Sequence, residues 1–160
     1  MKTPNSLIEN CKIGEGTKIW NFTNLYGCDI GKNCNIGSYV EIQNKVTVGD
    51  DVTISSHSLI CSLVTIEDNV FIGHGVMTIN DLFPPSKKRT GSDSHWKRTL
   101  IKKGAIIGSH ATLFPVTIGK ESVVGAGSVV IKDIPDGEVW AGNPAKFIKK
   151  TEDLHENPLG

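Results

Sequence analysis

The sequence has no long apolar run and no excess of charge of either sign. Seventeen Lys and Arg balance seventeen Asp and Glu over 160 residues, which argues against a chain that coats nucleic acid or a membrane surface. No stretch approaches the ~18 apolar residues of a membrane span, and the segment MKTPNSLIEN lacks the apolar region of a signal peptide. The length fits a single domain. We therefore expect a cytoplasmic protein that binds neither nucleic acid nor membrane.

The sequence also lacks any cysteine pattern that indicates a metal or disulfide framework. The four cysteines form neither a CxxC pair nor a spacing typical of zinc sites. They are Cys11, Cys28, Cys34 and Cys61. The pattern excludes a disulfide scaffold and predicts reduced thiols, mostly with structural roles, in a cytosolic protein.

What the sequence does contain is a six-residue repeat. An aliphatic residue recurs at every sixth position, at Ile30, Ile36, Ile42, Val48, Ile54, Ile60, Ile66 and Ile72. The frame starts at Ile13, slips by one residue before Ile30 and again before Ile118, and ends near Val130. A helix would give spacings of three and four and a half-buried strand a spacing of two, so neither explains a period of six.

A period of six fits one short strand followed by a corner. The aliphatic residue and a small residue four positions later point inward, and Gly, Asn or Asp at the corners supplies a positive φ. Such units bury little by themselves and must stack as a solenoid. We expect this solenoid over residues 1–150 as a single domain, with a short helix or cap over 138–150 and a polar tail over 151–160.

The repeat is followed by the segments IGSHATLFPVTIGKESVVGAGSVVIKDIP (107–135) and AGNPAK (141–146). Together they resemble the hexapeptide-repeat acyltransferases. The resemblance implies an all-β fold, a left-handed parallel β-helix of triangular section, and a homotrimer with active sites between neighbouring subunits. Left-handedness comes from the resemblance alone, because parallel crossovers are in general right-handed.

The repeat is interrupted once, over residues 79–100, by a long loop. A loop of this length in a tight solenoid is usually functional or disordered. Between Lys87 and Lys103 seven basic residues face one acid, a net charge of +6. The charge predicts a lid for a phosphate-bearing ligand, with Arg89, Lys97 and Arg98 as candidate contacts; the alternative is a solvated charged loop. Trp96 stacks on a base or anchors the loop, and we favour the anchor.

Three histidines are candidates for acid–base chemistry. If three repeats form one coil, His57, His74 and His110 lie on the same face of successive coils, about 5 Å apart per step. A histidine near the mouth of the loop is a plausible general base, since imidazole titrates near neutral pH. We favour His74 and then His57. A corner histidine with only a local hydrogen bond is the alternative for each of them.

The start of the loop departs from one branch of the family. Sugar O-acetyltransferases place a catalytic histidine there, whereas this sequence has Asn80 followed by Asp81. This difference disfavours a hydroxyl acceptor and favours an amine, oriented by Asn80, with Asp81 or His74 taking the proton. The segments SSHSLICSLVTIED (55–68) and VFIGHGVMTIND (70–81) resemble bacterial N-acetyltransferases that act on nucleotide-linked amino sugars. Within that group the resemblance points to dTDP-3-amino-3,6-dideoxyhexoses, which feed surface glycans such as the O-antigen.

The resemblance also implies acetyl-CoA as the acyl donor and no metal cofactor. Matching the closing segments position by position assigns CoA contacts to Ser109, Ala126, Ile131 and Lys132. It places Lys146 and Lys149 near the adenosine phosphates. The chemistry requires backbone amides along the pantetheine arm and cations for the phosphates.

Three alternatives remain open at this point. The same fold occurs in γ-type zinc carbonic anhydrases, which need three imidazoles, but Pro115 stands where a near partner of His110 would be. A second alternative keeps the acetyltransferase and changes the acceptor to a hydroxyl, a 4-amino sugar or a UDP-sugar. The third is a non-catalytic scaffold on the same fold, which the long basic loop disfavours.

Overall fold

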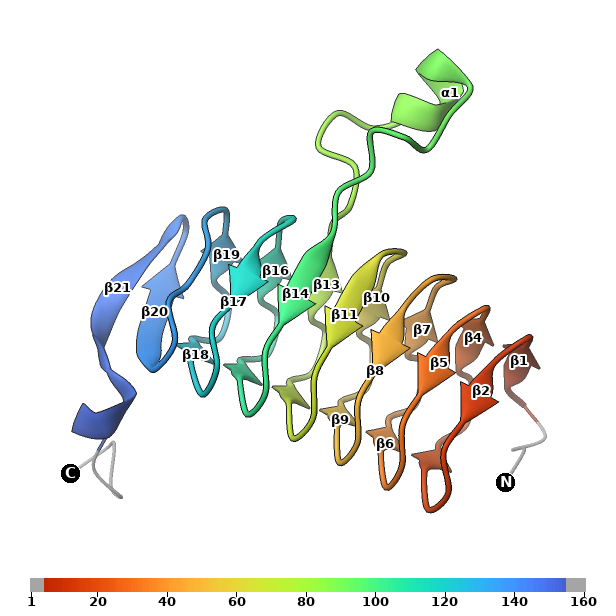
Figure 1. Ribbon diagram of the computed structural model, residues 1–160, viewed down its shortest axis with the longest axis horizontal. Helices are drawn as coiled ribbons and strands as arrows, with labels where there is room; N and C mark the ends of the chain where they lie inside the picture. The colour runs from red at the N-terminus through yellow and green to blue at the C-terminus, as the bar shows by residue number, and fades with distance from the viewer. Residues whose placement is uncertain (1–4, 155–160) are drawn as a thin grey trace.

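The computed structural model describes residues 5–154 and shows a parallel β-solenoid (Figure 1). Each coil contributes one short strand to each of three sheets, so the section is triangular. The solenoid has about seven coils and is left-handed, which confirms the fold class that the resemblance implied. No helix within the described part of the chain has the length and apolar character needed to cross a membrane.

The strands follow one another from sheet to sheet along the chain. The first sheet contains β1 (Leu7–Glu9), β4 (Asn24–Tyr26), β7 (Glu41–Ile42), β10 (Leu59–Ile60), β13 (Met77–Thr78), β16 (Thr112–Leu113) and β19 (Val129–Val130). The second contains β2 (Lys12–Ile13), β5 (Asp29–Ile30), β8 (Thr47–Val48), β11 (Val64–Ile66), β14 (Thr99–Ile101) and β17 (Thr117–Ile118). The third contains β3 (Lys18–Ile19), β6 (Asn35–Ile36), β9 (Thr53–Ile54), β12 (Phe71–Ile72), β15 (Ile106–Ile107), β18 (Val123–Val124), β20 (Glu138–Gly142) and β21 (Ala145–Lys150).

The strand register confirms that three repeats make one coil. Leu59 pairs with Glu41 on one side and with Met77 on the other, a step of three full repeats in each direction. Where the repeat slips, between β4 and β7, Asn24 pairs with Glu41 and the coil is shorter by a single residue. Because the missing residue falls at a corner between strands, the aliphatic residues stay on the inner face.

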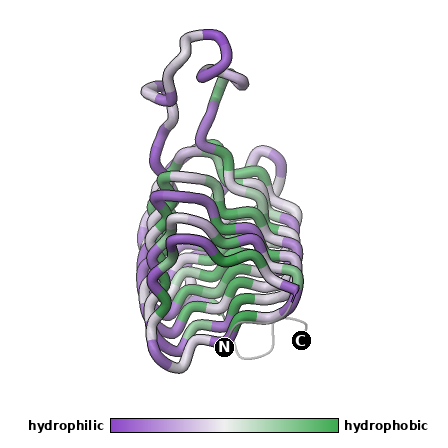
Figure 2. The backbone as a smooth tube through the Cα atoms, turned by 90° about the vertical axis from the view of Figure 1, so that its right-hand side faces the viewer, coloured by the Kyte–Doolittle hydropathy of each residue, from purple (hydrophilic) through white to green (hydrophobic). Residues whose placement is uncertain are grey.

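The aliphatic residue of each repeat forms the core. Ile36, Ile42, Ile54, Ile60 and Ile72 are fully buried, each above its counterpart in the coil before. Figure 2, which looks along the solenoid, shows the hydrophobic segments of successive coils stacked on one another. A single coil cannot bury these side chains, so the stability of each coil depends on its neighbours.

The corners confirm only part of the expectation about positive φ. Asn33, Asp51 and Asn69 adopt it, as do several glycines. At the corner between the third and first sheets, however, bulky residues do so: Phe22, Tyr39, His57 and His110 have φ between 59° and 65°. Aromatic stacking offsets this strain, since the Phe22 and Tyr39 ring centroids lie 5.1 Å apart and those of Tyr39 and His57 4.8 Å apart. We call the corner between the third and first sheets the histidine corner.

The glycine that follows many aliphatic residues has a different role from the corner residues. A Cβ added at Gly73 would lie 2.6 Å from the backbone nitrogen of Ser109 in the next coil. The coils therefore approach each other too closely there for any side chain.

The inserted loop and the C-terminal cap differ from expectation in detail. The loop covers residues 79–98 and carries α1 (Ser86–Thr90), because β14 already begins at Thr99. The cap is a β-hairpin rather than a helix: β20 extends the third sheet and β21 returns antiparallel to it. The tail begins with a 3₁₀ turn at Thr151–Asp153, and its residues 155–160 lie outside the described residues.

Candidate functional site

The three histidines lie at the same corner of successive coils but not in one row. His57 and Gly75 donate their backbone N–H groups to Ser38 and Ser56 of the preceding coils, while His110 donates to His74. His57, Gly75 and His110 therefore share one row, and His74 belongs to the neighbouring row. The three histidines thus share a corner, but the coil after His57 keeps three full repeats, and His74 stands a single position short of that step.

The two rows give the histidines different surroundings. The His57 ring stacks on Tyr39 with an interplanar angle of 10°. The His110 ring leans over Gly75, where an added Cβ would be 2.7 Å from its Nδ1 atom. Both rings thus pack along the corner, whereas the exposed side chain of His74 lines a groove on the third sheet. Of the two favoured bases, His74 is the one that faces a site able to hold a ligand.

This groove has a volume of about 380 Å³ and a neutral, hydroxyl-rich lining. It is lined by Trp20, Asn35, Ser38, Ser56 and His74, among others. The Trp20 side chain is 55% exposed, and its Nε1–H donates to Asn35 Oδ1 at 2.8 Å, which fixes the plane of the indole. Sequence reasoning missed Trp20 and the serines. Ser38 and Ser56 precede His74 at intervals of 18 residues, which was a usable signal, but Trp20 aligns with Gly37 and belongs to a different row.

Two of the expected CoA contacts lie directly beyond His74. The row of Ser38, Ser56 and His74 continues with Ser109 and Ala126, because Gly127 donates its N–H to the Ser109 carbonyl. The Ser109 hydroxyl accepts the His74 backbone N–H at 3.2 Å. The groove, His74 and these two residues thus form one continuous line across the coils.

A second pocket, of about 270 Å³, lies at the C-terminal end of the first sheet. It brings together Ile131, Lys132 and Lys146 with two residues that sequence reasoning missed, Trp140 and Phe147. Lys149 lies further along β21 and is not part of the lining.

The indole of this pocket is held in place by an ionised carboxylate. Glu138 accepts hydrogen bonds from Trp140 Nε1 at 2.8 Å and from Lys150 Nζ at 2.6 Å. These two hydrogen bonds, that from Lys150 first, hold the pKa of Glu138 below its usual range. The indole therefore keeps its position at any pH near neutrality.

The long loop leaves from a different corner, between the first and second sheets, which we call the loop corner. Asn80 stands at its neck: its carbonyl accepts the Lys97 N–H at 2.8 Å and its Nδ2 donates to the Ser62 carbonyl at 3.2 Å. His74 lies six residues earlier, at the histidine corner on the other side of β13. The pockets lined by Asp81 and by His74 have no residue in common.

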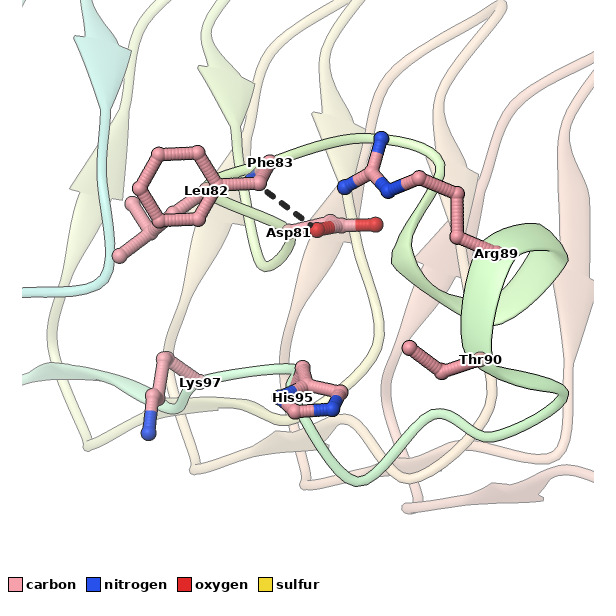
Figure 3. A pocket seen from close by; sticks show the side chains of 7 residues that line it. All are labelled: Asp81, Leu82, Phe83, Arg89, Thr90, His95 and Lys97. Carbon is pink, nitrogen blue, oxygen red and sulfur yellow. Dashed lines mark hydrogen bonds between the residues drawn. The ribbon is translucent and has the colours of Figure 1, made fainter.

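The loop encloses a pocket of its own, of about 270 Å³ (Figure 3). Asp81, Phe83, Arg89, His95 and Lys97 line it, and the Phe83 ring is 76% exposed. Arg89 comes from α1 and extends over the pocket on the same side as Asp81 (Figure 3). Two of the three candidate cations, Arg89 and Lys97, thus line one pocket, and Arg98 does not.

The charge of the loop is smaller than its sequence neighbourhood implied. Lys102 and Lys103 lie beyond β14 and pair with Asp136 at 3.2 Å and with Asp68 at 3.9 Å. Residues 79–98 carry five cations and two carboxylates, a net charge of +3, whereas the +6 of residues 87–103 includes Lys102 and Lys103 and leaves out Asp81. Trp96 is half-buried inside the loop, which fits the anchor better than an exposed stacking platform.

No three metal-ligating side chains come together within residues 5–154. A zinc site of three imidazoles therefore does not form within the described part of one chain.

Comparisons with known proteins agree with this architecture. The family model described as bacterial transferase hexapeptide (six repeats) matches residues 27–62, and that of the hexapeptide repeat of succinyl-transferase matches residues 99–132. The mitochondrial gamma carbonic anhydrase 2 of Arabidopsis thaliana is 33% identical over 92% of this chain and 46% of its own length. A 2,3,4,5-tetrahydropyridine-2,6-dicarboxylate N-acetyltransferase of Clostridium perfringens is 41% identical over 52% of this chain and 32% of its own length. The chain thus spans less than half of these relatives.

Among solved structures, one neighbour was crystallised with informative ligands. An aspartate variant of AntD, an N-acyltransferase from Bacillus cereus in complex with dTDP and coenzyme A, superposes with a TM-score of 0.75. It is 25% identical, and the match covers 87% of this chain and 83% of that one. The two matching family models thus identify hexapeptide repeats of the bacterial transferase type over residues 27–62 and 99–132, in agreement with the coiled architecture.

Proposed function

We propose that the protein is an acetyl-CoA-dependent N-acetyltransferase that acylates the amine of a nucleotide-linked amino sugar. The observation that carries the proposal is the C-terminal pocket, where Ile131 and Lys132 meet Lys146 from the returning strand of the cap. Two cations beside an indole and a phenyl ring suit the phosphates and adenine of CoA. The dTDP and coenzyme A bound to AntD support the same pair of ligands here.

The groove on the third sheet, together with His74 and Ser109 beyond it, supplies the groups that carry out the reaction. The sugar lies in the groove against the Trp20 indole, with the Ser38 and Ser56 hydroxyls as hydrogen-bond partners. Its amine attacks the thioester carbonyl of acetyl-CoA and gives a proton to the His74 imidazole; the C–S bond then breaks, and the CoA thiolate takes that proton and leaves as the thiol. A hydrogen bond from its backbone N–H to Ser109 holds His74 beside the donor. Such a reaction uses cytoplasmic metabolites, so we place the protein there.

A homotrimer would complete this site. The loop leaves from the loop corner, whereas the His74 groove lies on the third sheet, so the loop that closes over this groove comes from a neighbouring subunit in the proposed trimer. Exposed apolar side chains on the sheets next to the histidine corner, Phe71, Met77 and Ile106, are available for such contacts. In this assembly Arg89, Lys97 and Arg98 face the diphosphate of the acceptor and Asp81 stands near its amine.

The first experiment is a thiol-release assay with acetyl-CoA and a panel of dTDP- and UDP-linked 2-, 3- and 4-amino sugars. Turnover with a dTDP-3-amino-3,6-dideoxyhexose, and little with the others, is the expected result. Acetylation only of hydroxyl compounds would replace the amine acceptor. No thiol release with any sugar of the panel, while acetyl-CoA still binds, would rule out a nucleotide-linked amino sugar as the acceptor.

The C-terminal pocket gives a prediction about the donor. Lys146→Ala should raise the KM for acetyl-CoA about tenfold, because a charge-assisted hydrogen bond to phosphate is lost. Steady-state kinetics with acetyl-CoA as the varied substrate measures the change. Lys12→Ala is the matched control, since Lys12 is exposed at the other end of the solenoid, where it pairs with Asp29. An unchanged KM in the Lys146 variant would show that CoA lies elsewhere.

The neck of the loop gives a second prediction. Asn80→Ala should raise the KM for the sugar acceptor more than it lowers kcat, because the Asn80 side chain ties the loop to the Ser62 carbonyl. The same assay with the sugar as the varied substrate tests this. A loss confined to kcat would instead give Asn80 the role of orienting the amine.

One relative favours a second candidate, zinc-dependent hydration of carbon dioxide. The Arabidopsis carbonic anhydrase matches 92% of this chain. The described residues bring no three ligands together within one chain, and Pro115 follows His110 where that chemistry needs a ligand. Bound zinc in stoichiometric amount together with carbon dioxide hydration would establish this candidate in place of acetyl transfer.

A further inference from the structure

Two cysteines touch each other at the N-terminal end of the solenoid. Cys11 lies between β1 and β2 and Cys28 between β4 and β5, at the loop corner of the first two coils. Both are free thiols, and their Sγ atoms are 3.3 Å apart. They are two or more coils away from His74 and from the C-terminal pocket, so the proposed function makes no use of them.

Strand register places the two residues directly opposite each other. Lys12 pairs with Asp29 in the parallel ladder of β2 and β5, and Lys12 N–H donates to the Cys28 carbonyl at 3.1 Å. Neighbouring strands lie about 4.8 Å apart, which falls within the Cα–Cα range of about 4.4–6.8 Å found in disulfides. Both side chains occupy the inward place that holds Val46 and Val64 in later coils. The sulfur atoms can therefore bond after small side-chain rotations.

The two thiols differ in access. Cys11 is half-buried and lines a groove of about 480 Å³ at the open end of the solenoid, beside Ile8 and Ile13. Cys28 is 1% exposed, and burial first, then its hydrogen bond with Cys11, raises the pKa of its thiol. A reagent from solvent thus reaches Cys11 first, and Cys28 is held in place to react second.

The remaining two cysteines provide an internal comparison. Cys34 Sγ donates to the Gly49 carbonyl at 3.1 Å, and Cys61 Sγ accepts from the Thr78 hydroxyl at 3.2 Å. Both are buried, and no other sulfur lies beside either of them in the described residues. Burial alone therefore does not distinguish the pair at the end of the solenoid; the sulfur–sulfur contact does.

We infer that Cys11 and Cys28 form a redox-active dithiol that closes to an intramolecular disulfide in the presence of a small-molecule disulfide such as oxidised glutathione. The Cys11 thiolate attacks one sulfur of glutathione disulfide and releases one glutathione thiol. Cys28 then loses its proton, and its sulfur displaces the second glutathione from Cys11. Two cysteine S–H groups are lost, one S–S bond forms, and one glutathione disulfide becomes two glutathione thiols.

The bond would join the end coil covalently to the next one. Strands β1, β2 and β3 each have a neighbour on one side only. In a solenoid the terminal coil is held by a single interface and opens first. The disulfide would thus slow the opening of residues 7–26 under oxidising conditions, independently of any acetyltransferase activity.

The test uses the full chain, equilibrated with oxidised and reduced glutathione at several ratios, quenched with an alkylating agent and mapped by mass spectrometry. We expect two of the four thiols to disappear together, with one peptide linking Cys11 to Cys28. Hydrogen exchange in residues 7–26 should be slower in the oxidised than in the reduced protein. Cys34→Ser and Cys61→Ser variants should form the same disulfide.

Two further variants test the order of the steps. Cys28→Ser should stop at a glutathione adduct on Cys11, whereas Cys11→Ser should leave Cys28 unmodified in the folded protein. Circular dichroism checks that each variant is folded. Pairing of Cys34 or Cys61, disulfide-linked dimers, or a wild-type protein that stops at the Cys11 adduct would each overturn the proposal.

Discussion

His74→Asn is expected to lower kcat of the proposed acetyl transfer by about 100-fold or more, with a modest change in KM. The imidazole lines the acceptor groove, and its backbone is bound to the hydroxyl of Ser109, next to the donor. Asparagine keeps a polar side chain of similar size but cannot accept and release the proton. Initial rates at saturating acetyl-CoA and acceptor measure the effect.

His57→Asn separates the two histidines that the sequence favoured. The His57 ring stacks on Tyr39 and packs along the corner, so its loss should cost stability more than rate. The ratio of the kcat loss to the KM change adds a second readout, because a base should lose rate while its KM changes little, in the His74 variant only. If both variants keep wild-type rates, neither histidine is the base, and the proton passes to water or to the leaving thiolate.

Ile107→Ala is expected to lower the free energy of unfolding by about 2–5 kcal/mol. Ile107 is 0% exposed in β15, stacked between Ile72 and Val124 of the adjacent coils. Because the coils are closely stacked, the neighbouring side chains cannot move in to fill the space of the lost Ile107 atoms, so a cavity remains. Equilibrium unfolding in urea, followed by circular dichroism, measures the change.

Ile148→Ala is the matched control for the core. Ile148 is 54% exposed on β21, so the same substitution there should cost about 1 kcal/mol or less. Similar losses for the two variants would contradict the assignment of Ile107 to a packed core. If Ile107→Ala lowers the free energy of unfolding but leaves its dependence on urea concentration unchanged, the coils still unfold together.

The period of six was sufficient to predict a solenoid and most of its core, while the family resemblance supplied the triangular section and the handedness. Ile30 to Ile72 all point inward as expected, because a strand of two residues and a corner leave one aliphatic place per side of the triangle. The slip before Ile30 was also visible in the sequence, and the structure confirms that it shortens one coil without turning its inner residues outward. The cap was less predictable, since its hairpin follows the edge of the third sheet and not the repeat.

The candidate site was predicted only in pieces. The sequence indicated His74 through its place near the mouth of the loop, and Lys132 and Lys146 through the family that the closing segments resemble. It missed Trp20, Trp140 and Phe147, because an exposed aromatic at an outward place has no periodic signal. It also overestimated the charge of the loop, since the pairing of Lys102 with Asp136 depends on segments 34 residues apart.

The sequence by itself thus determined that the chain stacks as a solenoid and where its long insertion lies, whereas the triangular section and the left-handedness came from the family resemblance. The physical reason is that six-residue units bury their aliphatic residues only by stacking on one another. Tertiary structure alone decided which row each histidine joins, that Asn80 is bound to the neck of the loop, and that Cys11 faces Cys28. Those outcomes depend on whether a given coil keeps three full repeats or is shortened by a slip, and on how its corner turns. A single residue of difference moves a side chain to another row.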